Sequence, residues 1–330
     1  MQARKANFTV SYNGKNITED ISQFCETVTY TDKLEAQSDE IDITLENKDG
    51  RWFNEWYPEK GATLQVRLYD DALQLNCGVF TLDEIEFTDG VGGSRVSIRG
   101  LAANYSKAIR SSTSIAHENK SLQQIINQVA AKHGFTVVGT VAPIHFNRIT
   151  QHQQTDLDFL QCLAKQYGYV MNVRNNDLIF TDLFTLEDAP HILTLNRNQI
   201  GSFRVTDKLS QTFKSSKVVH YYTRDKKRVE YTTREGKQQT APDDLNTVER
   251  AENETQANRK SKVNLHRANS KIVTGRVDVE GNLLLVAGVN LHINAMGKLA
   301  GIYQAISSVH TVDSSGGYST NLDVKRLRNV

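Results

Sequence analysis

Cysteine and proline are scarce in this sequence. The three cysteines, Cys25, Cys77 and Cys162, are odd in number and far apart, and no C-x-x-C pair occurs. This spacing disfavours both a disulfide framework and a zinc site, so we expect plain buried or half-buried thiols. Four prolines and 38% hydrophobic residues in a chain of 330 are typical of an ordinary folded protein of two or three domains.

An excess of one charge and a long apolar run are also missing. Basic and acidic residues number 39 and 38, which gives no electrostatic reason to expect specific nucleic-acid binding or attraction to a membrane surface. No segment approaches the roughly 18 apolar residues of a membrane-spanning helix. The N-terminal MQARKANFTV lacks the apolar core of a signal peptide. We therefore expect no membrane insertion and a protein that is cytosolic when it is made.

Motifs for covalent chemistry and for cofactors are absent as well. The chain has no G-x-S-x-G elbow, no G-x-x-x-x-G-K-[ST] loop, no G-x-G-x-x-G fingerprint and no H-E-x-x-H helix. His145 and His152 flank a predicted strand without a carboxylate or cysteine at ligand spacing. We interpret His292 and His310 as structural. The sequence predicts no cofactor and no metal.

Neighbouring carboxylates do not form a catalytic pair either. Asp156 and Asp158 stand at i and i+2 of a predicted helix and point to different faces. Asp158 is better explained as a capping partner, and Asp156 as a favourable charge on the first turn. Asp83, Glu84 and Glu86 alternate between the two faces of a predicted strand. We therefore expect a protein that is not an enzyme.

Residues 6–100 carry the alternating pattern of short strands. Turn signals such as Asn13-Gly14 and Asp49-Gly50 separate segments rich in β-branched residues. The predicted strands are NFTVSYNG, CETVTYTD, DEIDITLEN, ATLQVRLYD, CGVFTLDEIEF and SRVSIRGL. So many short strands in one segment predict a small antiparallel β-barrel or sandwich.

An aromatic loop interrupts this pattern after the third strand. The candidate interface residues are Arg51, Trp52, Phe53, Trp56 and Tyr57. Flanked by turn residues, they can either form an exposed contact site or cover one end of the barrel as a lid. The sequence leaves both interpretations open.

Two capped helices mark a different module from about residue 105. Ser121 and Gln124 form a capping-box pair ahead of an apolar stripe, and Gly134 ends that helix. Thr155 is the N-cap of a second helix, which Gly168 ends. A strand pattern follows each glycine, so the segment is predicted to be an α+β module.

Strand patterns return from residue 192. The segments are ILTLN, IGSFRVTDK, KSSKVVHYYT, KRVEYTTR, GRVDVEG, LLLVAGVNLHI, GIYQAISSVHTVD and YSTNLDVKR. Residues 234–256 have hardly any bulky apolar side chains and are predicted to be a flexible insertion. The charged residues 224–228 beside them are interpreted as a hairpin tip or a solvated face. Residues 249–268 are predicted to be helical, and the final strands are predicted to form a second small barrel.

The amino-acid sequence of the second helix resembles that of a known family. Residues 150–170, TQHQQTDLDFLQCLAKQYGYV, resemble the hub segment of the late control gene D protein family, which forms the baseplate hub of contractile phage tails. They are also similar to the hub portion of type VI secretion spike proteins. The resemblance continues through Val273-Thr274-Gly275, Val309-His310 and Ser315–Thr320.

The resemblance and the patterns together imply an α+β fold, mostly β. Two small tube-protein-like antiparallel β-barrels are expected to flank the α+β module. We place the first barrel at 1–104, the module at 105–190 and the second barrel at 191–330. A polar and helical insertion is expected within the second barrel at about 220–270.

The resemblance also implies a structural function at the tail tip. Family members form a homotrimeric, pseudo-hexameric ring that adapts the hexameric tail tube to the trimeric spike. The implied partners are the chain itself, a spike protein expected as a separate chain, the tail tube protein, and tape-measure and baseplate wedge proteins. The alternative is a carbohydrate-binding or cell-wall-degrading tail-tip protein, because exposed Trp52, Trp56 and Tyr57 can stack on sugar rings. Phage, bacteriocin and toxin-injection device are left open as the parent particle.

Overall fold

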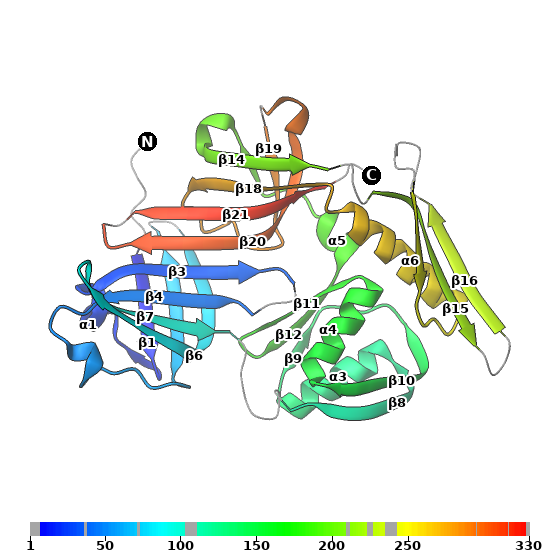
Figure 1. The fold of residues 1–330 in the computed structure, drawn as a ribbon, viewed down its shortest axis with the longest axis horizontal. Helices are drawn as coiled ribbons and strands as arrows, with labels where there is room; N and C mark the ends of the chain where they lie inside the picture. The colour runs from blue at the N-terminus through cyan, green and yellow to red at the C-terminus, as the bar shows by residue number, and fades with distance from the viewer. Residues whose placement is uncertain are drawn as a thin grey trace.

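Strands dominate the computed structural model, and the longer helices lie among the strands on the right-hand side of the view (Figure 1). The model describes residues 7–35, 38–70, 73–102, 111–208, 212–222, 227–234, 243–294, 296–315 and 317–327. The predicted α+β, mostly-β class is confirmed. Within the described ranges, every helix is too short or too polar to cross a lipid bilayer.

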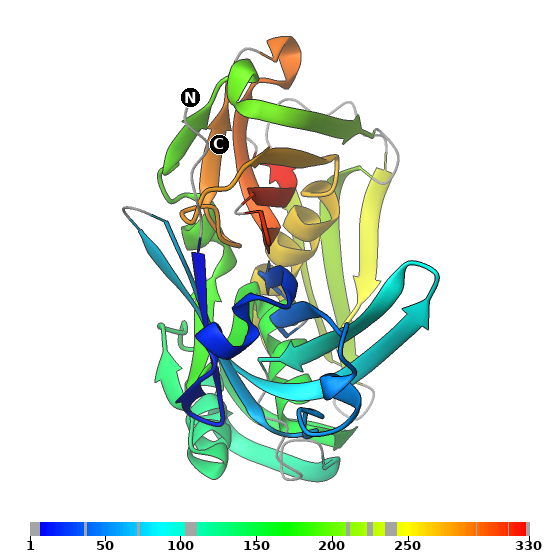
Figure 2. The ribbon, with the colours of Figure 1, turned by 90° about the vertical axis from the view of Figure 1, so that its left-hand side faces the viewer.

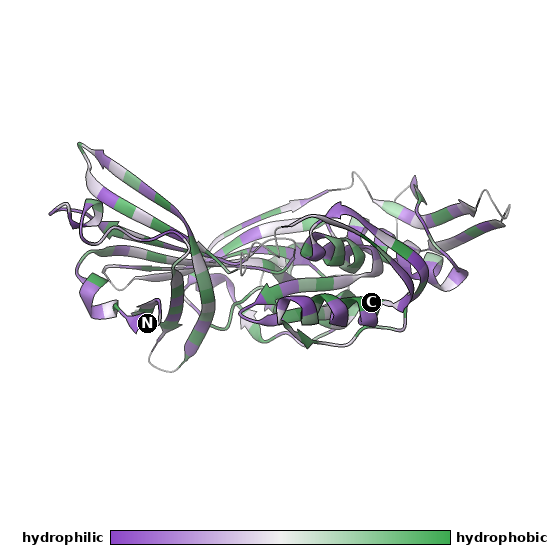
Figure 3. Cartoon of the chain, turned by 90° about the horizontal axis from the view of Figure 1, so that it is seen from below, coloured by the Kyte–Doolittle hydropathy of each residue, from purple (hydrophilic) through white to green (hydrophobic). Residues whose placement is uncertain are grey.

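The N-terminal strands form what we call the first sheet half. It comprises β1 (Asn7–Tyr12), β2 (Lys15–Asn16), β3 (Cys25–Lys33), β4 (Glu40–Glu46), β5 (Thr63–Tyr69), β6 (Gln74–Gly90) and β7 (Gly93–Leu101), with α1 (Thr18–Ser22) and the 3-10 turn η1 (Arg51–Phe53). The six strands predicted from alternation are all present. Hydrophilic and hydrophobic residues alternate along these strands (Figure 3), and this alternation made them predictable from sequence.

The C-terminal strands form the second sheet half. It comprises β13 (Leu193–Leu195), β14 (Ile200–Asp207), β18 (Val273–Glu280), β19 (Asn290–Ile293), β20 (Gly301–Asp313) and β21 (Tyr318–Arg326), with the 3-10 turns η2 (Arg197–Gln199) and η3 (Gly297–Leu299). One prediction here was wrong: residues 283–289 form local turns, and the strand begins only at Asn290. Leu283 and Leu285 are both buried, so the apolar side chains of this loop belong to the core although they do not lie on a strand.

The two halves are joined into one hydrogen-bonded sheet. β3 pairs antiparallel with β20, from Lys33 opposite Ser307 to Thr27 opposite Asp313. Among the described strands the main path runs β14-β18-β21-β20-β3-β4-β7-β6-β5-β1-β2, so β14 and β1–β2 stand at its ends. The path is open, and closure of each half into a barrel therefore stays a prediction. The domain boundaries also stay predictions.

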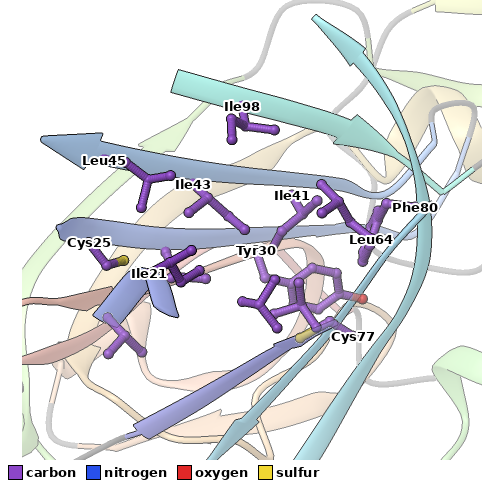
Figure 4. Close-up of a cluster of buried hydrophobic side chains, with 14 of the residues drawn as sticks. Ile21, Cys25, Tyr30, Ile41, Ile43, Leu45, Leu64, Cys77, Phe80 and Ile98 are labelled. Atoms are coloured by element: carbon purple, nitrogen blue, oxygen red, sulfur yellow. The ribbon is translucent and has the colours of Figure 1, made fainter. Parts of the chain in front are cut away.

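The first half buries its inward side chains between curved strands (Figure 4). Alternate residues of β4, namely Ile41, Ile43 and Leu45, point into this core. Burial raises the pKa of both Cys25 and Cys77 to about 12, so these thiols are inert packing groups. Cys162 departs from the expectation of burial, because it lies on an exposed face of its helix.

The α+β module follows the first half. It comprises β8 (Thr113–Ser121), α3 (Leu122–His133), β9 (Thr136–Val138), β10 (His145–Gln154), α4 (Asp156–Tyr167), β11 (Tyr169–Arg174), β12 (Asp177–Asp182) and the short α5 (Leu183–Glu187). The predicted capping box is present: the Ser121 hydroxyl accepts from the Gln124 N–H at 3.2 Å, and the Ser121 N–H donates to Gln124 Oε1 at 2.8 Å. The Thr155 hydroxyl likewise accepts from the Asp158 N–H at 3.1 Å. Gly134 and Gly168 end the two helices in the left-handed conformation that a side chain disfavours.

A separate three-stranded sheet lies beyond the module, beside the longest helix (Figure 1). It comprises β15 (Phe213–Tyr222), β16 (Lys227–Arg234) and β17 (Asp243–Val248), and α6 (Glu254–Asn269) covers it. The prediction of a flexible insertion at 234–256 was wrong for 243–248, which form β17, and for the first residues of α6. Residues 224–226 of the predicted charged tip and residues 235–242 of the insertion lie outside the described residues.

Helix α6 fastens the module to the sheet through arginine side chains. Arg259 donates from Nε to the Tyr167 carbonyl at 2.8 Å, at the C-terminal end of α4. Arg267 forms a two-pronged pair with Glu35 at 2.8 and 3.0 Å, next to the first half. A thin apolar stripe is therefore enough to hold α6 in place, because its polar side chains also bind neighbouring parts of the chain.

The tightest backbone approach in the second half predicts a stability defect. A Cβ on Gly281 would come within 1.9 Å of the Tyr318 ring, whose hydroxyl lies 2.7 Å from His310 Nδ1. We expect Gly281→Ala to lower the free energy of unfolding by about 1–3 kcal/mol, because the ring must shift. Gly90→Ala, where nothing lies within 4 Å, is the control. Equal urea denaturation midpoints for the two variants would contradict the prediction.

Candidate functional site

The aromatic loop is divided between the core and the surface. Trp52 is only 4% exposed and belongs to the core of the first half. Its ring meets Trp56 edge to face at a centroid distance of 5.3 Å, and its backbone N–H donates to Asn47 Oδ1 at 3.2 Å. Trp52 is therefore unavailable to a partner, which corrects the expectation that it is an exposed aromatic.

Arg51 holds the loop in place. Its guanidinium lies over the rings of Phe24 and Trp56, at 4.2 and 4.7 Å from their centroids. The same group donates from Nε to Asp49 Oδ2 at 2.7 Å, and this contact holds the pKa of Asp49 below its usual value. The stacked cation and its ion pair order the loop at the end of the first half.

Phe53 and Tyr57 form the exposed part of the loop. They are 46% and 52% exposed, and both rings pack on Phe87 of β6, at 4.9 and 5.6 Å. We call these three residues the aromatic ledge. The hairpin of β6 and β7 continues past it, away from the body of the molecule (Figure 2), to the fully exposed Val91. The role of the aromatic loop as an interface stays a prediction. The accessible aromatic surface of the ledge supports it.

A cavity of about 680 Å³ adjoins the loop. It opens at the end of the first half, and its walls include Tyr12, Lys15, Ile17, Trp56 and Glu59. Its walls combine apolar side chains with the charged groups of Lys15 and Glu59. The sequence could name the loop, but it could not show that a cavity adjoins it.

The histidines considered from sequence are dispersed. His145 and His152 both lie on exposed positions of β10, and His292 lies on β19. In the parts of the chain that the structure describes, no three His, Cys, Asp or Glu side chains are grouped to hold a metal ion. His310 is buried between the hydroxyls of Tyr318 and Ser308, at 2.7 and 3.0 Å from its ring nitrogens. Burial lowers the pKa of His310 to about 4, so it is a neutral packing residue.

Asp156 lies in the first turn of α4, as the sequence predicted, and it has a second role. It is 3% exposed, and its carboxylate accepts from Lys132 Nζ at 2.6 Å, from Gln151 Nε2 at 3.0 Å and lies 2.7 Å from His133 Nε2. Burial alone would raise its pKa, but these hydrogen bonds lower it to about 2. Asp156 is thus an internal anchor between α3 and α4, in addition to being a first-turn charge. Lys132 and His133 lie 24 and 23 residues away in sequence, so the helix pattern could not reveal them.

The fold is that of phage and prophage tail proteins. The 43 kDa tail protein of prophage MuSo2 from Shewanella oneidensis aligns with a TM-score of 0.74 at 16% identity, over 97% of this chain and 98% of that one. A type VI secretion component from E. coli, described as similar to the T4 tail proteins gp27 and gp5, aligns with a TM-score of 0.58 at 11% identity, over 93% of this chain and 74% of that one.

The chain belongs to the phage tail baseplate hub (GPD) family, whose model matches residues 35–312. It is 27% identical to the probable baseplate hub protein of Escherichia phage 186 over an alignment of 229 residues that covers 67% of this chain. The matched part spans 57% of that relative's length. The resemblance recognised in the α4 segment is thereby confirmed at the level of the family.

Trp52 and Phe53 are adjacent in the loop, but their substitution should affect stability very differently. Trp52→Ala should lower the free energy of unfolding by about 3–5 kcal/mol, since it empties a core position. Phe53→Ala, the matched control, should lower it by less than about 1 kcal/mol because its ring is half exposed. Chemical denaturation of both variants checks this. A similar loss of unfolding free energy in the two variants would place Phe53 in the core as well. The loop would then have no separate buried and exposed parts.

Proposed function

We propose that this chain is a structural hub of a contractile tail or tail-like injection machine. Three copies form a ring at the tail tip, in which each chain supplies two similar sheet halves. The ring adapts the six-fold tail tube on one side to the three-fold spike on the other. On this proposal the function resides in surfaces, and no step of covalent chemistry is assigned to the chain.

The observation that carries this proposal is the pairing of β3 with β20. It sets the two sheet halves of one chain side by side in a continuous sheet, as a ring with two units per chain requires. The path ends at β14 on one side and at β1–β2 on the other, where backbone groups at a sheet edge favour pairing with another strand. Joining the end of one copy to the opposite end of the next is a heterologous contact, which closes into a ring when the rotation permits.

The partners follow from the same geometry. A ring with three-fold symmetry and six similar units can meet a trimeric spike through its true symmetry and a hexameric tube through its approximate one. We therefore propose the chain itself, a spike protein and the tail tube protein as direct partners, with tape-measure and baseplate wedge proteins next to them. The proposed location is the baseplate of the mature particle, after assembly in the bacterial cytoplasm.

Glycan binding at the tail tip is the second candidate. The half-exposed rings of Phe53 and Tyr57, rather than the tryptophans, are the feature that supports it. Saturable binding of cell-wall fragments, or their hydrolysis, by the purified chain would favour this candidate over a purely structural hub.

The mass of the protein in solution tests the ring. Light scattering of the purified chain, alone and mixed with its trimeric spike, should give a species of three chains or a complex of three hub chains per spike trimer. The open sheet ends and the spike's symmetry both favour that number. A strict monomer under both conditions would contradict the proposal.

The aromatic ledge predicts a defect confined to assembly. The double variant Phe53→Ser with Tyr57→Ser should weaken association by about tenfold or more, because exposed aromatic anchors dominate interface energies. Its melting temperature should stay close to that of the parent. Tyr221→Ser on β15, where the side chain is 54% exposed, is the control for loss of an exposed aromatic residue. Assembly that is unimpaired in the double variant would rule the ledge out as an interface.

A further inference from the structure

Three parts of the chain converge on Arg174, at the end of β11 in the α+β module. Its Nη2 donates to Asp32 Oδ1 at 2.9 Å, to Asp39 Oδ2 at 3.2 Å and to the Tyr30 hydroxyl at 3.0 Å. Both carboxylates come from the first sheet half and are buried, at 2% and 0% exposure. The other oxygen of Asp32 accepts from the Ala287 N–H of the second half at 3.0 Å. Asp32 therefore touches the module and the second half at once.

The charges at this junction do not balance. Two carboxylates share one guanidinium, so the ionised cluster is a buried group of net charge −1, which a low-dielectric interior disfavours. Burial raises the pKa of Asp32 to about 6, and the like charge of Asp39 adds to this. Arg174 and the Ala287 N–H act in the opposite direction but do not offset it.

The other ionisable groups around Asp32 come from its own strand and from β6 and β20. On its own strand, burial raises the pKa of Tyr30 far above neutrality, and Lys33 is paired with Glu40 of β4 at 2.7 Å. On β6, burial raises the pKa of the Cys77 thiol to about 12. On β20, the His310 ring stacks on Tyr30 at 6.1 Å, and burial lowers its pKa to about 4.

We propose that Asp32 is a proton switch at the junction of the α+β module with the two sheet halves. Taking up a proton leaves Asp39 and Arg174 as a balanced pair and tightens the junction. Losing the proton leaves an uncompensated buried charge and loosens it. The device lies in the interior, away from the aromatic ledge, and does not depend on the proposed ring.

The direction of the pH effect follows from the raised pKa. Folded Asp32 holds its proton up to about pH 6, whereas an ordinary aspartate releases it near 3.8. The stabilisation from its protonation is therefore fully present below about 3.8 and is lost as the pH rises through about 6. Acidification from pH 7.5 to 4.5 should strengthen the junction.

Unfolding of the full chain and of Asp32→Asn across that pH range tests the switch. Asparagine keeps an oxygen for the Ala287 N–H and carries no charge at any pH. The measured quantity is the ratio of the parent's unfolding constant to that of the variant. When the pH is lowered from 7.5 to 4.5, this ratio should fall on the order of tenfold. His310 is present in both proteins, so its own titration cancels in the ratio. Asp42→Asn, on the neighbouring strand β4, is the control and should not reproduce the effect.

A second variant keeps the test decisive if Asp32→Asn fails to fold. Asp39→Asn removes the like charge, so this variant should gain less stability on acidification than the parent. Hydrogen exchange at the Ala287 amide, corrected for the intrinsic pH dependence, should slow on acidification in the parent and less so in Asp39→Asn. A flat or rising ratio for Asp32→Asn, or equal pH responses of the parent and Asp39→Asn, would overturn the proposal.

Discussion

The antiparallel pairing of β3 with β20 is the interaction on which the rest of the structure depends. Seven residue pairs join strands that are almost the whole chain apart in sequence. The pairing is reinforced by the stacking of Tyr30 on His310 and by a hydrogen bond from the Ser314 N–H to the Glu26 carbonyl at 2.9 Å. Because such a non-local contact carries a large loop-closure cost, it needs a packed core on either side of it. Both sheet halves supply one.

Polar contacts with specific partners help to hold the α+β module and α6 against this sheet. Arg174, Arg259 and Arg267 each engage a carboxylate and, for two of them, a helix or strand carbonyl. Guanidinium groups suit this task because they present several donors in a fixed geometry. Buried charges of this kind fix one arrangement of the parts, at the cost of unfavourable desolvation at Asp32 and Asp39. The proposed hub depends on such a fixed arrangement, because it presents matched surfaces to two partners.

Local sequence was sufficient for the parts whose signals are local. The strands before residue 102, the capping box at Ser121 and the glycine stops at Gly134 and Gly168 were all predictable, because alternation and capping act within a few residues. What depends on distant partners was not. The burial of Trp52 beside the exposure of Phe53 is set by how the loop folds onto the core. β17 was missed because it is covered on one face only and so carries few apolar residues.

On the proposed function, one chain supplies two neighbouring units to a six-part ring. Electron microscopy of the hub bound to its spike tests this most directly, because it shows the symmetry of the sheet layer without labels or variants. The predicted result is a true three-fold particle whose sheet layer repeats approximately six times, with β3 and β20 at the contact between the two units of each chain. A layer that repeats only three times, or units of one chain that do not adjoin through β3 and β20, would contradict it.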